Sequence, residues 1–118
     1  MNKNIKSLSP INNPLNSILV EKRFKNIDQK FIEIIKIANK LPRTTVIESS
    51  NNYWHGVCKS FIFRFPDDLE ILKFKSEKYL DKSEGVIQIR SASRFGQSDL
   101  GVNKRRVQRL LFQLKKNS

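Results

Sequence analysis

The chain has 118 residues, which suits one domain with one modest core. Hydrophobic residues make up 38% and charged residues 29%, a globular balance that excludes a disordered chain, and no apolar run reaches the roughly 18 residues of a membrane span. The net charge of +12, from 23 basic and 11 acidic residues, favours an acidic partner such as nucleic acid, anionic lipid or an acidic protein surface.

Lysine accounts for much of this excess, in a chain rich in Asn and Ile. Such a bias is also typical of an AT-rich genome and of a solvated surface, so the charge alone does not identify a ligand. The single cysteine, Cys58, excludes an intrachain disulfide. Because no apolar stretch follows MNKNIKSLSP, we expect no signal peptide and a cytoplasmic location.

The first 25 residues are expected to form an N-terminal arm, mobile or loosely docked, because SPINNPLNS combines proline with turn-forming Asn and Ser. We expect residues 26–118 to form one α+β domain. Its first helix is predicted over 28–41, where apolar residues recur at helical spacing before Pro42.

Four strands are predicted after this helix, from β-branched and aromatic residues. They span residues 44–50, 53–65, 69–75 and 86–93, with a turn at Pro66, Asp67 and Asp68. A last helix is predicted over 100–115, with Ser98 or Asp99 as its cap. Short consecutive strands favour an antiparallel sheet of about four strands with both helices packed on one face.

One stretch, RSASRFGQSDLGVN at residues 90–103, concentrates polar side chains at the predicted strand-to-helix corner. Arg90 and Arg94 offer forked donors that suit a carboxylate or a phosphate. Gly96 and Gly101 would let backbone amides approach a ligand, at the start of a helix that favours anions. These features predict an anion pocket.

The same residues also fit a purely structural network. Asp99 would cap the helix, an arginine would pair with Asp67, Asp68 or Asp99, and Asn103 would fix the turn by bonds to the backbone. Both interpretations stay open on the sequence alone.

The segment VIQIRSASRFGQSDLGVNKRRVQRL, together with FPDDLE at residues 65–70, closely resembles the signature of a family of uncharacterised proteins, domain of unknown function 1499. The resemblance covers about Ile27 to Leu114. It implies that the motif's polar residues act together as one cluster, and it assigns no reaction. Relatives occur in bacteria and plastids, sometimes behind a membrane anchor. The chain departs from the family where SPINNPLNS replaces a cysteine-containing segment and where Gln97 replaces an aromatic residue.

Catalytic and metal chemistry have little support in the sequence. His55 and Cys58 are three residues apart on a predicted strand, so their side chains would point to opposite faces rather than form a dyad. Adjacent carboxylates such as Asp67 and Asp68 usually point apart and are solvated. We therefore expect no catalytic residue, metal site or cofactor, and an enzyme ranks third among the hypotheses.

The first hypothesis is a non-catalytic module with a polar cluster that binds an anion or a partner, such as a small anion or an acidic protein surface. Arg90 and Arg94 would carry the charge contact, oriented by Asp67, Asp68, Asp99 and Asn103, with Ser91 and Ser93 as secondary hydrogen-bonding groups. The second is a nucleic-acid-binding module, because residues 104–118 contain six basic residues and no acid. It would use Lys104, Arg105, Arg106 and Arg109. An anionic membrane surface fits on similar grounds.

Overall fold

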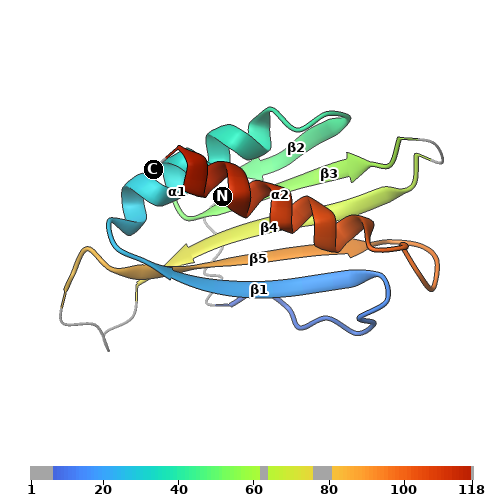
Figure 1. Ribbon diagram of the computed structural model, residues 1–118, viewed down its shortest axis with the longest axis horizontal. Helices are drawn as coiled ribbons and strands as arrows, with labels where there is room; N and C mark the ends of the chain where they lie inside the picture. Colours follow the sequence, from blue (N-terminus) through green and yellow to red (C-terminus); the bar gives the residue numbers. More distant parts are fainter. Residues whose placement is uncertain (1–6, 62–63, 76–80, 118) are drawn as a thin grey trace.

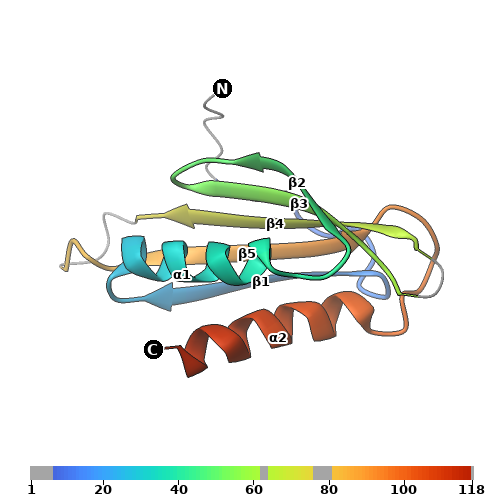
Figure 2. The ribbon, with the colours of Figure 1, turned by 90° about the horizontal axis from the view of Figure 1, so that it is seen from above.

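The computed structural model describes residues 7–61, 64–75 and 81–117, and places five strands in one antiparallel sheet (Figure 1). The strands are β1 (Ser17–Phe24), β2 (Thr44–Ser49), β3 (Tyr53–Lys59), β4 (Pro66–Phe74) and β5 (Gly85–Ser93), in the order β1-β5-β4-β3-β2. Helix α1 (Ile27–Asn39) joins β1 to β2, and α2 (Val102–Lys116) follows β5. Figure 2 shows both helices on the same side of the sheet. The predicted α+β class is confirmed, with five strands instead of about four.

The additional strand is β1, which lies within the N-terminal arm predicted over residues 1–25. Its sequence SILVEKRF has an apolar half followed by a charged half, so it lacks the alternation that predicts a strand. It is extended because it pairs with β5 along its whole length, from Ser17 opposite Ala92 to Phe24 opposite Gly85. Tertiary pairing therefore decides this element.

The β3–β4 hairpin turns earlier than predicted. Strand β3 ends at Lys59 rather than at residue 65, and residues 62–63 of the predicted strand lie outside the described part of the chain. Pro66, Asp67 and Asp68 do not form a turn but begin β4, where Asp67 lies opposite both Cys58 and Ser93. Proline fits here because the first position of a strand tolerates the missing N–H.

Both helices bury one stripe against the sheet. The buried positions are Ile27, Phe31, Ile34 and Ala38 in α1, and Asn103, Val107, Leu110 and Leu114 in α2. Each set follows the same spacing of four, three and four residues, which keeps side chains on one helical face. They pack on Trp54, Leu69, Ile71, Ile87 and Ile89 of the sheet. One polar residue, Asn103, begins the stripe of α2.

The face of the sheet away from the helices is partly covered by the chain's own N-terminal residues. Leu8 is buried against Tyr53 and Leu72, and its amide donates to the Oε1 atom of Gln88 at 2.9 Å. Strand β5 is consequently buried on both faces over most of its length. Within the described residues, neither helix has the length and apolar character needed to cross a bilayer.

Gly56 should tolerate no side chain. A Cβ atom built there would lie 2.4 Å from Cη2 of Trp54, and this ring is fully buried and donates from Nε1 to Oδ1 of Asn39 at 2.9 Å. We expect Gly56→Ala to lower the free energy of unfolding by about 1–3 kcal/mol, the usual cost of overpacking. Urea denaturation measures this, with Thr45→Ala on the exposed side of β2 as the control. If Gly56→Ala is as stable as wild type, the Trp54 ring can move aside to admit the methyl group.

Candidate functional site

The polar motif at the end of β5 is divided between the two faces of the sheet. Successive strand residues point to opposite sides. Ser91 and Ser93 therefore face α2, whereas Arg90 and Arg94 point away from it, toward Glu70 and Asp68. The same alternation separates Asp67 from Asp68 on β4.

On the helix side, the motif forms what we call the inner network: Asp67, Ser91, Ser93, Asp99, Asn103 and Arg106. Asn103 is fully buried at its centre. Its Nδ2 atom lies 2.7 Å from Oδ2 of Asp99, 2.9 Å from Oγ of Ser93 and 3.0 Å from the carbonyl oxygen of Asn16. Its Oδ1 atom accepts from Oγ of Ser91 at 2.6 Å and from Nη1 of Arg106 at 2.8 Å. One amide thereby joins α2, β5 and the segment before β1.

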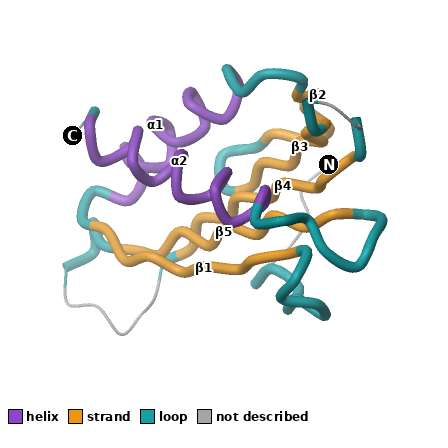
Figure 3. The backbone as a smooth tube through the Cα atoms, turned by 45° about the vertical axis from the view of Figure 1, so that its right-hand side comes forward, coloured by secondary structure: helices purple, strands orange, loops and turns teal. Residues whose placement is uncertain are grey.

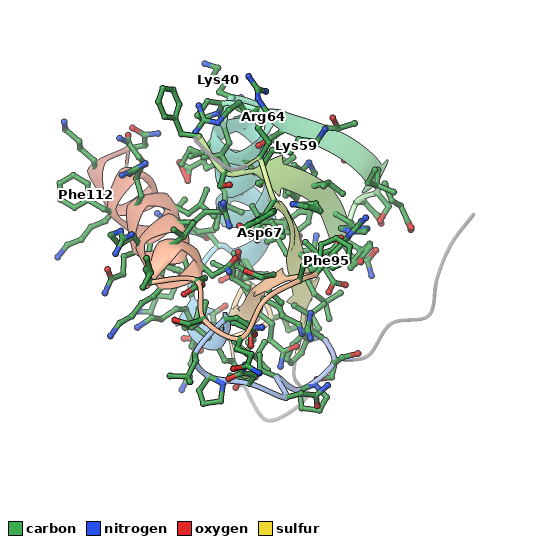
Figure 4. The ribbon with its side chains drawn as sticks, turned by 90° about the vertical axis from the view of Figure 1, so that its right-hand side faces the viewer. Lys40, Lys59, Arg64, Asp67, Phe95 and Phe112 are labelled. Atoms are coloured by element: carbon green, nitrogen blue, oxygen red, sulfur yellow. The ribbon has the colours of Figure 1, made fainter. Side chains whose placement is uncertain are left out.

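A buried ion pair extends this network to β4. Nη2 of Arg106 lies 2.9 Å from Oδ2 of Asp67, with side chains only 12% and 4% exposed. Figure 4 shows Asp67 in the interior, between the sheet and α2. The sequence predicts Arg106 on the basic nucleic-acid face, but this residue follows the buried Asn103 by three positions and so lies on the inward side of α2.

Asp99 fixes the first turn of α2. Its carboxylate accepts the backbone amides of Gly101 at 2.7 Å and Asn103 at 3.0 Å. Burial opposes ionisation of this carboxyl, but these bonds and the one from the Asn103 side chain outweigh it and lower its pKa. The residue at the helix boundary is Gly101, so Asp99 acts on the helix start from two positions upstream of it.

On the opposite face lies what we call the outer cluster: His55, Asp68, Glu70, Arg90 and Arg94. Asp68 accepts two bonds from Arg94, from Nε at 2.8 Å and from Nη2 at 2.9 Å, and lies 2.7 Å from Nε2 of His55. The Arg94 bonds, followed by the His55 bond, hold the pKa of Asp68 below its usual value despite partial burial.

Arg90 is held by the N-terminal residues and by Glu70. Its Nε atom donates to the carbonyl oxygen of Ser9 at 3.0 Å, and Nη1 lies 3.7 Å from Oε1 of Glu70. Tyr53 donates to the same carboxylate, and burial together with this bond raises the pKa of its phenol.

Four of the seven predicted ligand-binding residues thus belong to the inner network, and three belong to the outer cluster. Asp67, Ser91, Asp99 and Asn103 meet on the helix side, whereas Asp68, Arg90 and Arg94 lie across the sheet from them. The chain does not bring all seven into one cluster.

Cys58 and His55 likewise occupy opposite faces, where Cys58 is buried in the core beside Thr44. Among the described residues, no group of three or more His, Cys, Asp or Glu side chains could hold a metal ion.

A family model described as "Protein of unknown function (DUF1499)" matches residues 9–114. The chain belongs to the DUF1499 family. We expected the match to begin at residue 27, but it begins further upstream. It therefore includes part of the N-terminal arm and all of β1. A comparison with curated proteins found no match.

This DUF1499 protein has a second polar feature, which sequence reasoning missed. A pocket of about 220 Å³ opens between α2 and the neighbouring ends of β2 and β3. Its cationic lining side chains are Arg43, Lys59, Arg105, Arg106 and Arg109, and no carboxylate lines it among the described residues. We call it the basic pocket. Arg105 and Arg109 were predicted as part of a basic helix face, whereas Arg43 and Lys59 come from distant segments that no sequence motif joins.

The inner ion pair of this DUF1499 domain should be essential to its stability. Arg106→Gln leaves the buried Asp67 carboxylate without its cation, and we expect a loss of about 3–5 kcal/mol of unfolding free energy. The double variant Asp67→Asn/Arg106→Gln removes both charges and should lose clearly less than the sum of the single losses. A double-mutant cycle in urea measures this coupling, and additive losses would contradict it.

The outer cluster of the DUF1499 domain predicts a pH dependence. The folded pKa of Asp68 lies below its ordinary value of 3.8, so ionised Asp68 stabilises the fold above that pH. The contribution is lost as pH falls through the folded pKa. Asp68→Asn should therefore be less stable than wild type near neutral pH, by at most about 1 kcal/mol because the pair is partly exposed. The difference should shrink in strong acid. Arg94→Gln serves as the matched variant, since it removes the same pair.

Proposed function

We propose that this protein is a non-catalytic binding module whose ligand carries a phosphate group, and that the basic pocket binds this group. The observation that carries the proposal is the pocket's lining of four arginines and one lysine without a carboxylate among the described residues. Guanidinium forks match phosphate oxygens, and several cations in one concave site raise the local concentration of an anion.

The cations of the basic pocket are not equally neutralised by the protein. Arg106 is paired with Asp67, but no described carboxylate forms an ion pair with Arg43, Lys59, Arg105 or Arg109. Arg43 donates from Nε to the carbonyl oxygen of Lys59 at 3.1 Å, and Arg105 donates from Nη1 to that of Leu100 at 3.0 Å. These bonds orient the two guanidinium groups and leave their charge available.

Arg90 and Arg94, the first candidates from the sequence, have a different environment. Their described partners are carboxylates and backbone carbonyl groups of this chain. In our proposal they brace the outer face, and the anion contact belongs to the basic pocket. Its volume is below the roughly 300–1,000 Å³ of pockets for drug-sized ligands, so it suits one phosphate group rather than a whole nucleotide.

Nucleic acid remains the second candidate, favoured by one specific arrangement. Arg109 also lines a neighbouring pocket together with Lys36 of α1 and Lys40 just after it, so cations continue along the helices beyond the basic pocket, with Glu33 as the one carboxylate in that lining. A row of this kind can contact successive phosphates. Such binding would weaken steeply with salt and respond to each lysine and arginine by a similar amount.

Thermal unfolding with inorganic phosphate, at constant ionic strength, tests the proposal. At about ten times the dissociation constant, bound phosphate stabilises the fold by about 1.4 kcal/mol, a shift of about 5 °C in Tm. Arg43→Gln/Arg105→Gln should abolish the shift. The control Lys22→Gln/Lys25→Gln removes the same charge from an exposed site on and after β1 and should retain it.

Arg94→Gln distinguishes the two candidate anion sites. If it alone abolishes the phosphate shift and the Arg43→Gln/Arg105→Gln variant keeps it, the anion contact lies on the outer cluster and our assignment is wrong. If wild type shows no shift, the phosphate proposal itself fails.

A further inference from the structure

Exposed apolar side chains gather at one end of the molecule. Among the described residues, nine large apolar side chains are clearly exposed, and five of them lie at this end. They are Leu15 (64% exposed), Phe61 (75%), Phe65 (54%), Phe95 (65%) and Leu100 (84%). We call this set the apolar end. The loops that carry Phe61 and Phe95, after β3 and after β5, project at the same end of the sheet (Figures 1 and 3).

Leu15 belongs to this end through a contact between segments distant in sequence. Its carbonyl oxygen accepts the backbone amide of Asp99 at 3.0 Å, which fixes the turn before β1 beside the β5–α2 loop. Phe61, Phe65, Phe95 and Leu100 line a pocket of about 400 Å³. The apolar end therefore combines projecting side chains with an open hollow that is mostly apolar and also has Asp67 and Asp99 in its lining.

The apolar end is continuous with the basic pocket. The two pockets share Ser60, Phe61, Val102 and Arg105 in their linings, and the guanidinium carbon of Arg43 lies 5.3 Å from the centroid of the Phe61 ring. In Figure 4, which views the molecule from this end, Lys59 and Arg64 lie near each other above Asp67, and Phe95 lies at its side. A surface that contacts this end thus meets apolar and cationic groups together.

The backbone at this end is held in unfavourable conformations. Arg43, Arg64 and Leu100 have φ angles of 54°, 55° and 55°, three of the four positive-φ residues other than glycine in the described chain. Side chains with a Cβ atom are disfavoured in this left-handed region. Leu100 gains little from burial to offset that strain, since it is 84% exposed. Strain of this kind often accompanies functional loops.

We propose that the apolar end docks on a bilayer that contains anionic phospholipids, an inference that rests on the proposed phosphate-binding function. The lipid phosphates would meet Arg43, Lys59 and Arg105, while Phe61, Phe95 and Leu100 enter the boundary between headgroups and acyl chains. A bilayer supplies both an apolar phase and closely spaced phosphates over the whole width of this end, and aromatic side chains favour that boundary. The net charge of +12 is complementary to such a surface.

Co-sedimentation of the full chain with vesicles tests the inference. We expect binding to phosphatidylcholine–phosphatidylglycerol vesicles and much weaker binding to pure phosphatidylcholine vesicles. Each basic residue near an anionic surface raises the partition coefficient about fivefold, so Arg43→Gln/Arg105→Gln should lower it about 25-fold. The control Lys22→Gln/Lys25→Gln removes the same charge near the end of β1 that lies away from the apolar end. It gives the effect of net charge alone and should lower the partition coefficient far less.

The apolar contribution has its own matched variants. Phe61→Ser/Phe95→Ser should lower the partition coefficient at least about tenfold, because two aromatic rings no longer leave water. The control Ile32→Ser/Phe112→Ser alters two exposed apolar residues on the outer surfaces of α1 and α2 and should leave it unchanged. Leu100→Gly relieves the left-handed strain, so it should raise Tm and still weaken vesicle binding. A misfolded variant would not combine a higher Tm with weaker vesicle binding.

Four outcomes would overturn the docking inference. If phosphate stabilises the protein through the basic pocket but the protein does not co-sediment with vesicles, the proposed function stands and a bilayer is not the protein's partner. If anionic vesicles bind the Phe61→Ser/Phe95→Ser variant as well as wild type, the contact is charge adsorption only. If a single-stranded oligonucleotide displaces the protein from vesicles and its own binding is unaffected by that variant, nucleic acid is the partner. Absence of both the phosphate shift and vesicle binding removes both proposals.

Discussion

The side chain of Asn103 links three parts of the chain that are far apart in sequence. It bonds to Ser91 and Ser93 of β5, to the carbonyl oxygen of Asn16 before β1, and to Asp99, which precedes its own helix. A buried amide satisfies both its donors and its acceptor only when all these segments are in place. The position of α2 on the sheet, and with it the direction of the loop before α2, depends on this one group.

The buried pair of Asp67 and Arg106 adds a second constraint to the same corner. Because the two charges are almost completely removed from water, the pair holds β4 and α2 in one relative position and strongly penalises any variant that leaves one charge alone. On the other face, Arg94 and Asp68 form a pair that is more exposed and contributes less. The polar motif therefore has most of its hydrogen-bonding capacity satisfied within the protein.

The cationic side chains that remain available lie outside the polar motif. Arg105 and Arg109 point outward from α2, and Arg43 and Lys59 reach the same pocket from the start of β2 and the end of β3. Phe95 and Leu100 sit in the loop that the inner network fixes at both ends. A rigid corner that carries an exposed, strained loop is a suitable support for binding, because the loop is already ordered before any ligand arrives.

The sequence by itself determined the class of fold, both helices, and the position of the polar corner. Helical periodicity and the strand-to-helix motif are local signals, so they can be read from neighbouring residues. Strand β1 and the start of β4 at Pro66 could not be read in this way, because both depend on pairing with strands elsewhere in the chain. Tertiary structure alone decided which face each polar residue occupies. A shift of one residue reverses the face of a strand side chain, and this register separated Asp67 from Asp68 and Ser91 from Arg90. The basic pocket, too, exists only because folding brings Arg43 and Lys59 beside α2.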